Sequence, residues 1–95
     1  MIYRKGTLLI PTGPVRHLHI VMNDPVFSPE HNDERVLVVN ISSVIEGRFY
    51  DSTCVLQAGC HPFVLHPSYV YYKEAVVSSV PLISQRMEMG EISAE

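Results

Sequence analysis

Apolar side chains occur in short runs separated by turn-forming residues, which is typical of β-strands rather than of amphipathic helices. The runs are rich in Val, Ile and Tyr, whose side chains fit a pleated sheet better than a crowded helical turn. The nearly continuous run over residues 35–44 (RVLVVNISSV) should form the central strand. Other strands are expected over residues 7–11, 18–23 and 53–56, with a closing strand from 69–72 and 75–77 and a further candidate at 63–65.

Turn-forming residues separate these expected strands. A Thr-Gly-Pro turn at residues 12–14 should follow the first strand. Residues 24–35 (DPVFSPEHNDER) concentrate Pro, Asn, Asp and Ser, so they are expected to form an exposed acidic loop. Residues 66–68 are expected to open a single helical turn before the closing strand.

The pattern changes beyond Pro81, where PLISQRMEM contains good helix formers and Gly90 can end a short helix. Ninety-five residues suit one domain with one modest core. The fold is therefore predicted to be mainly β, with five to six short strands in a small barrel that hides its sheet edges. We assign residues 1–80 to this single β-barrel domain and residues 81–95 to a C-terminal helix or tail.

Composition narrows the protein class. With 46% apolar and 18% charged residues, the chain has enough apolar surface to fold as a globular protein. No stretch approaches the roughly 20 apolar residues needed to cross a bilayer, and the N-terminus lacks a signal-peptide pattern. Two cysteines, Cys54 and Cys60, do not make a disulfide framework. These features predict a cytoplasmic protein with no membrane partner.

Charge is distributed unevenly along the chain. The net charge of -3 argues against a surface covered with phosphate-binding side chains. Residues 1–22 nevertheless contain no acidic residue. They carry Arg4, Lys5, Arg16, His17 and His19. A phosphate-bearing ligand is therefore expected to meet the N-terminal third of the chain.

Two histidines form the first candidate site, because His61 and His66 both precede a proline within GCHPFVLHPSYVYY (residues 59–72). Histidine titrates near neutrality and can transfer a proton, and proline fixes the backbone that presents it. The alternative is that both are turn residues whose ring nitrogens bond nearby carbonyls.

Hydroxyl and cationic residues supply two more candidates. Ser42 and Ser43 end the central strand, where hydroxyls can position a phosphate or a 2'-hydroxyl, or simply satisfy a turn. Arg16, beside His17 and just past a Gly-Pro turn, can hold a phosphate bidentately or remain a solvated loop cation.

A zinc site is a further alternative, since four zinc-type ligands stand within a short segment, namely Cys54, Cys60, His61 and His66. Their spacing is poor, because paired zinc ligands usually stand two to four residues apart. The sequence also has no phosphate-cradling Gly-rich loop and no Cys-x-x-Cys pair. No metal and no cofactor is therefore expected.

The order of these features resembles the PemK/MazF-type toxin family. Lys5-Gly6-Thr7 looks like the family's opening, RHLHIVMND (16–24) like its basic loop and second strand, and VLVVNISS (36–43) like its central strand. GCHPFVLHPSYVYYKEA (59–75) is similar to a segment of a divergent PemK-like branch, and the resemblance spans about residues 5–77. It implies a small SH3-like barrel that forms a homodimer and cleaves single-stranded RNA.

The resemblance also implies site residues. An Arg before the second strand and a hydroxyl residue ending the central strand act on the scissile phosphate in this family. They correspond to Arg16 or His17 and to Ser42 or Ser43, although His17 and Leu18 stand where the family usually has Arg-Pro.

These observations lead to two hypotheses. The first is a metal-independent endoribonuclease of a type II toxin-antitoxin system, with an antitoxin partner and with His17 or His61 as acid or base. Its RNA-binding residues would be Arg4, Lys5, His19, His66, Tyr69, Tyr71 and Tyr72. The second is a non-catalytic SH3-like barrel, a degenerate toxin or a module that binds a protein partner.

Overall fold

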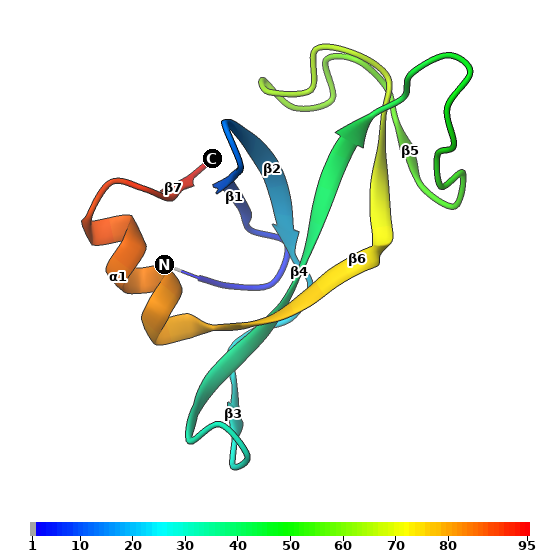
Figure 1. Cartoon of the computed structure of the whole chain (residues 1–95). Coiled ribbons are helices and arrows are strands. Elements are labelled where there is room, and N and C mark those ends of the chain that lie inside the picture. The colour runs from blue at the N-terminus through cyan, green and yellow to red at the C-terminus, as the bar shows by residue number, and fades with distance from the viewer. Residues whose placement is uncertain (1) are drawn as a thin grey trace.

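A curled antiparallel sheet dominates the computed structural model, which describes residues 2–95 (Figure 1). Hydrogen-bonded neighbours follow the order β5-β6-β4-β2-β1-β7, and β3 pairs with β4 beyond the end of β2. The described elements are β1 (Thr7–Thr12), β2 (Val15–Val21), β3 (Val26–Ser28), β4 (Asp33–Ser43), β5 (Val55–Leu56), β6 (Ser68–Ser79), α1 (Val80–Glu88) and β7 (Ser93–Ala94).

The predicted mainly β, barrel-like fold with a short C-terminal helix is confirmed. Several local expectations were wrong. The second strand begins at Val15, which places Arg16 and His17 on a strand rather than in a loop. The expected loop over 24–35 contains β3, because its central residues pair with the start of β4. Residues 63–65 form no strand, and Ser68 begins β6 instead of a helical turn.

The long pairing of β4 with β6 forms the spine of the molecule. Val38 pairs with Val76 and Asn40 with Tyr71, so two steps along β4 correspond to five along β6. Such a bulge bends the strand that carries the extra residues. Figure 1 shows β6 bending sharply along its length, and this bend helps the sheet to curl.

Both faces of the sheet carry a core. The first cluster packs between the sheet and α1, and the second fills the curl beneath the β5–β6 loop. The first contains Ile2, Leu8, Val21, Val36, Val38, Ile83 and Ile92. The second contains Leu18, Ile41 and Val64. Alternating strand residues supply opposite faces, so Leu18 and Val21 of β2 enter different clusters.

Helix α1 is tied to the sheet at its start and along one face. The Ser79 hydroxyl accepts a hydrogen bond of 3.3 Å from the backbone amide of Leu82, and proline stands in the first turn. Gly90, at φ +78°, follows the helix in a conformation that favours glycine. The chain then returns to pair β7 with β1. Within residues 2–95, no helix has the length and apolarity to cross a membrane.

His19 is buried in β2, on the face that carries the first cluster. Its Nδ1 donates to the backbone carbonyl of His17 at 2.8 Å, which fixes the neutral ring with Nε2 unprotonated. Burial lowers the pKa of His19, the carbonyl bond raises it in part, and repulsion from His17 lowers it further. The fold therefore favours the uncharged imidazole.

The contact of α1 with the sheet can be tested by truncating Ile83, which is 5% exposed. Ile83→Ala should lower the free energy of unfolding by about 2–5 kcal/mol, because it leaves a cavity in the first cluster. Leu82→Ala is the matched control: its side chain is 55% exposed on the same helix, so the loss should stay below about 0.5 kcal/mol. Urea unfolding measures both, and equal losses would contradict the packing described.

The burial of His19 predicts a pH dependence of stability. Since its pKa is lowered in the folded state, the unfolded chain binds a proton first as the pH falls through 6.5. The free energy of unfolding should therefore decline below that pH, and the decline should be shallower in His19→Gln. Urea unfolding over a pH series checks this, and identical declines in the two proteins would show that His19 is not responsible.

Candidate functional site

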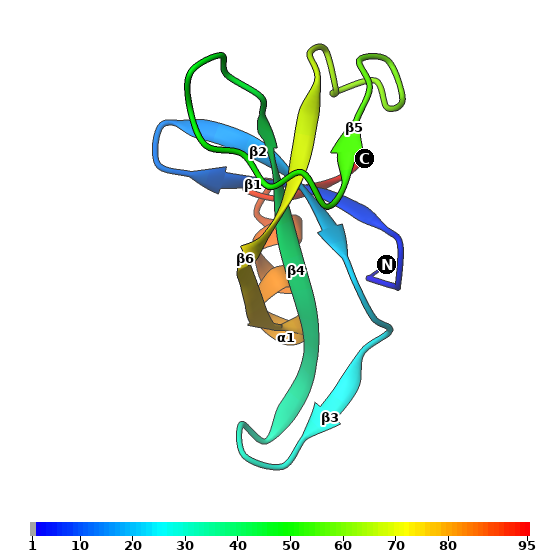
Figure 2. The ribbon, with the colours of Figure 1, turned by 90° about the vertical axis from the view of Figure 1, so that its right-hand side faces the viewer.

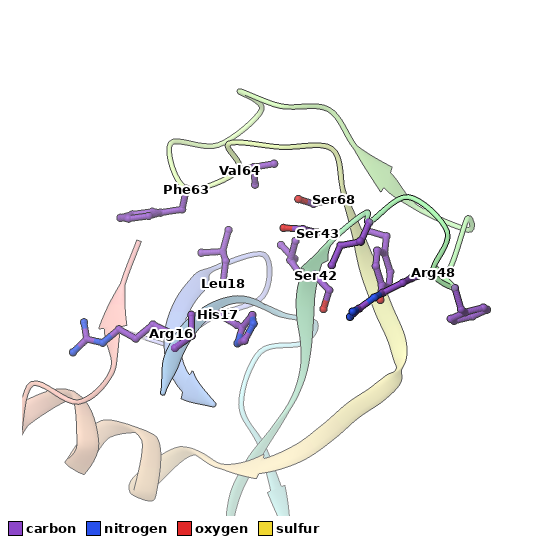
Figure 3. Close-up of a pocket in the computed structure, with 14 residues that line it drawn as sticks. Arg16, His17, Leu18, Ser42, Ser43, Arg48, Phe63, Val64 and Ser68 are labelled. Atoms are coloured by element: carbon purple, nitrogen blue, oxygen red, sulfur yellow. The ribbon is translucent and has the colours of Figure 1, made fainter. Parts of the chain in front are cut away.

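A cavity opens where β2 and β4 separate. The two strands pair only from His19–Asn40 to Val21–Val38 among the described residues. Continued pairing would set His17 opposite Ser42 and Arg16 opposite Ser43. Instead, each strand stays with its other neighbour, β2 with β1 and β4 with β6. The wedge between them holds a cavity of ≈ 490 Å³ (Figure 3).

Four predicted site residues line this cavity. Arg16 and His17 come from the start of β2, and Ser42 and Ser43 come from the end of β4. Leu18, Ile41 and Val64 of the second core cluster form its apolar part. The topology therefore brings together two segments that lie about 25 residues apart in the sequence.

The charge of the cavity differs from that of the whole chain. Two cations, Arg16 and Arg48, are among its lining residues, and none of those residues is Asp or Glu. The complete chain has a net charge of -3. A concave surface lined by one sign of charge concentrates ligands of the opposite sign, so this cavity favours an anion.

Arg48 was missed in the sequence because it lies in the long segment between β4 and β5. The backbone amide of Arg48 bonds the carbonyl of Ile45 at 3.1 Å, and Gly47 at φ +79° allows the tight turn. Its side chain points back toward the end of β4, where Ser42 lies (Figure 3). The only signal in the sequence was a cation shortly after the central strand.

Arg16 is held differently. Its Nη2 donates to the backbone carbonyl of Gly90 at 3.1 Å. Figure 3 shows the guanidinium directed from β2 toward the C-terminal segment rather than toward Ser42 and Ser43. The contact is exposed, so a bound anion competes with a single solvent-accessible hydrogen bond.

His17 is oriented by a neighbouring hydroxyl. Its Nδ1 hydrogen-bonds to the hydroxyl of Thr12, which lies across the β1–β2 hairpin. This contact engages one ring nitrogen and fixes the ring plane, which leaves Nε2 available to a ligand. Thr12 was not identified from the sequence, because the pairing of β1 with β2 brings it to the ring.

His61 lies outside this cavity, contrary to the expected catalytic grouping. Its Nδ1 accepts from the amide of Phe63 at 3.2 Å, and its Nε2 lies 3.4 Å from the hydroxyl of Thr7 and 3.3 Å from the carbonyl of Glu95. These contacts join the β5–β6 loop to β1 and to the chain after β7. These contacts agree with the alternative hypothesis, in which His61 is a turn residue whose ring nitrogens bond nearby groups.

The predicted RNA-binding residues are dispersed. Arg4, Lys5 and Tyr72 line a different cavity, beside the end of β2. His19 is buried in the sheet, and His66 is exposed in the loop before β6. These residues do not share one cavity in the described structure.

The aromatic residues near the cavity fall into two groups. Tyr69 is only 7% exposed, and its ring stands 5.5 Å from that of Tyr71, so it packs within the protein rather than facing a base. Phe49 and Phe63 also line the cavity, at 75% and 50% exposure. They are the rings available to a ligand, and neither was singled out in the sequence.

The zinc-type residues do not converge. Cys54 and Cys60 are free thiols, and His61 is engaged as described above. Across the residues that the structure describes, no three His, Cys, Asp or Glu side chains are grouped to hold a metal ion.

No protein-family model, curated protein or solved structure matches this chain. The resemblance to PemK/MazF-type toxins therefore stays a prediction. A function is inferred below from the residues that line the cavity between β2 and β4.

Proposed function

We propose that the cavity between β2 and β4 binds the phosphate backbone of single-stranded RNA and cleaves it without a metal ion, as a toxin-like endoribonuclease would. One observation carries the proposal: two arginines, a histidine and strand-end serines line a cavity whose lining residues include no carboxylate. Arginine binds phosphate through paired N–H donors, and hydroxyls add neutral donors.

Phosphate binding falls chiefly to Arg48 in this proposal. Its side chain is directed toward Ser42, whereas Arg16 is occupied by the Gly90 carbonyl. A guanidinium at this position stabilises the charge that develops on the phosphorus oxygens as the nucleophile adds. Ser42 and Ser43 orient the nucleotide on either side of the strand end.

His17 transfers the proton. Its free Nε2 takes the proton of the 2'-hydroxyl while the 2'-oxygen forms a bond to phosphorus. The bond from phosphorus to the 5'-oxygen then breaks, and that oxygen receives the proton from His17. The products are a 2',3'-cyclic phosphate and a 5'-hydroxyl. This step consumes no water and requires no metal ion.

Two exposed rings supply base contacts. Phe49 lies between β4 and β5 and Phe63 lies between β5 and β6, and both line the cavity. Stacking of bases on aromatic rings is a common mode of binding single-stranded nucleic acid, and it tolerates sequence variation. Bases flanking the bound phosphate can therefore splay onto these two rings.

A second candidate is a non-catalytic module that binds a partner protein. Exposed apolar side chains rim the same cavity, namely Ile45, Phe49, Phe63 and Val15. Such a rim is typical of protein interaction surfaces, because aromatic side chains contribute much of their binding energy. A module of this kind binds its partner and leaves RNA intact.

Cleavage of a long RNA by the purified protein distinguishes the two functions. We expect fragments ending in 2',3'-cyclic phosphate and 5'-hydroxyl, formed equally with and without chelator. Arg48→Ala should lower the cleavage rate by about 100-fold through loss of charge stabilisation. Arg86→Ala removes an arginine on α1 outside the cavity and should leave the rate unchanged. Intact RNA at enzyme excess would reject the nuclease.

The Thr12–His17 contact gives a finer prediction. Thr12→Val removes the hydroxyl but keeps the side-chain shape, so the His17 ring loses the hydrogen bond that orients it. We expect kcat to fall about tenfold, which is less than the rate enhancement that general acid–base catalysis usually supplies. The affinity for RNA should change little, because Thr12 is not among the residues that line the cavity. Single-turnover kinetics measure both quantities, and a loss confined to affinity would contradict the role given to Thr12.

A further inference from the structure

A second cavity lies along the seam of the curled sheet and shares no lining residue with the first. It measures ≈ 350 Å³ and is bounded by the segment before β1, the end of β2, and strands β5 and β6. Figure 2 shows the N-terminal segment and β5 on the same side of the molecule, to the right of β4. Within the loop that follows β5, the ring of His61 contacts the hydroxyl of Thr7.

The wall of this cavity is mostly apolar. Ile20, Leu56 and Val70 project from three strands, and Met22 continues the surface past the end of β2. Val70 is buried, whereas Met22 is exposed, so the cavity runs from the core to the solvent. A volume of this size is typical of sites for small organic molecules.

Two cations stand at the opening. The backbone amide of Lys5 bonds the carbonyl of Val21 at 2.7 Å, and the amide of Arg4 bonds Asp24 Oδ1 at 2.9 Å. Lys5 adopts φ +69°, a conformation that is rare for a residue with a side chain. The backbone bonds hold this turn in place, and the exposed residues Arg4 and Lys5 both line the cavity.

Neither cation is neutralised by an ion pair in the described part of the chain, where the salt bridges involve Arg35 and Arg86. No carboxylate lines the cavity, and Asp24 is engaged with the backbone of Arg4. The seam therefore combines an apolar interior with a positive rim.

Tyr72 and Cys54 supply uncharged polar groups to the lining of the cavity, and Tyr72 is exposed. Tyr72 comes from the bulged part of β6, and Cys54 immediately precedes β5. Desolvation, the nearby thiol of Cys54 and the charge of Asp51 raise the pKa of Tyr72. A protonated phenol can donate a hydrogen bond at neutral pH.

We propose that this seam cavity binds a small amphipathic carboxylate, with its aliphatic chain against Ile20, Leu56 and Val70 and its carboxylate near Arg4 and Lys5. The apolar wall alone would accept any small hydrophobe, but the two cations select an anion. The limited volume favours a medium-length chain over an extended polymer. The inference is independent of RNA cleavage, because the two cavities have no residue in common.

Decanoate is the probe, with decanol as the neutral comparison of equal chain length. Titration of the ¹⁵N-labelled full chain should give saturable amide shifts at the ends of β2 and β5 and in the bulge of β6. Decanoate should bind about tenfold more tightly than decanol, a difference typical of a charge-assisted hydrogen bond, and the difference should shrink at high salt. Equal affinities, shifts confined to the β2–β4 cavity, or no saturable binding would each overturn the proposal.

Variants test the cationic rim. The double variant Arg4→Gln with Lys5→Asn removes both charges, and Asn tolerates the backbone conformation of Lys5. It should weaken decanoate binding by about tenfold and leave decanol unchanged. The matched control, Lys73→Gln with Arg86→Gln, removes two cations that do not line the seam cavity. If the control weakens decanoate binding equally, the attraction is general to the protein's charge, and the proposed site is wrong.

Discussion

The separation of β2 from β4 is the constraint on which the rest of this structure depends. Six residue pairs hold β2 to β1, and β4 is paired with β6 along most of its length, whereas β2 and β4 share only three pairs. β2 stays paired with β1 and β4 stays paired with β6, so β2 and β4 diverge beyond His19 and Asn40. Leu18 and Ile41 remain in contact with the β5–β6 loop through Val64, which keeps the wedge from collapsing.

This divergence explains why polar side chains at two strand ends share one cavity. Had the pairing continued, His17 would stand directly opposite Ser42, and the strand backbones would leave no room between them. The wedge instead leaves Arg16, His17 and Ser42 lining one volume, with the Arg16 guanidinium turned toward Gly90, and the loop after β4 adds Arg48. The curl that creates this cavity also leaves the seam between β5 and the N-terminal segment, so one topology produces both cavities.

Local signals in the sequence predicted the elements that depend on neighbouring residues. The apolar run over residues 35–44 predicted β4, and Pro81 and Gly90 predicted the two ends of α1 to within about two residues. Elements that depend on distant partners were missed: β3 pairs within a turn-rich segment, and β7 is a two-residue strand that needs β1. The site shows the same division. The candidates at strand ends line one cavity, whereas Arg48 depends on the path of a loop. His61 lies outside that cavity, and its contacts with Thr7 and Glu95 join segments that are distant in the sequence.

The central claim is that the wedge between β2 and β4 is an anion-binding surface for RNA. Its most direct test is an NMR titration with a short RNA whose 2'-hydroxyls are methylated, which prevents cleavage. Saturable amide shifts should concentrate at the start of β2, the end of β4 and the turn around Arg48, and they should weaken as salt is raised. Shifts that centre on α1 and β3, or an absence of saturable shifts, would contradict it.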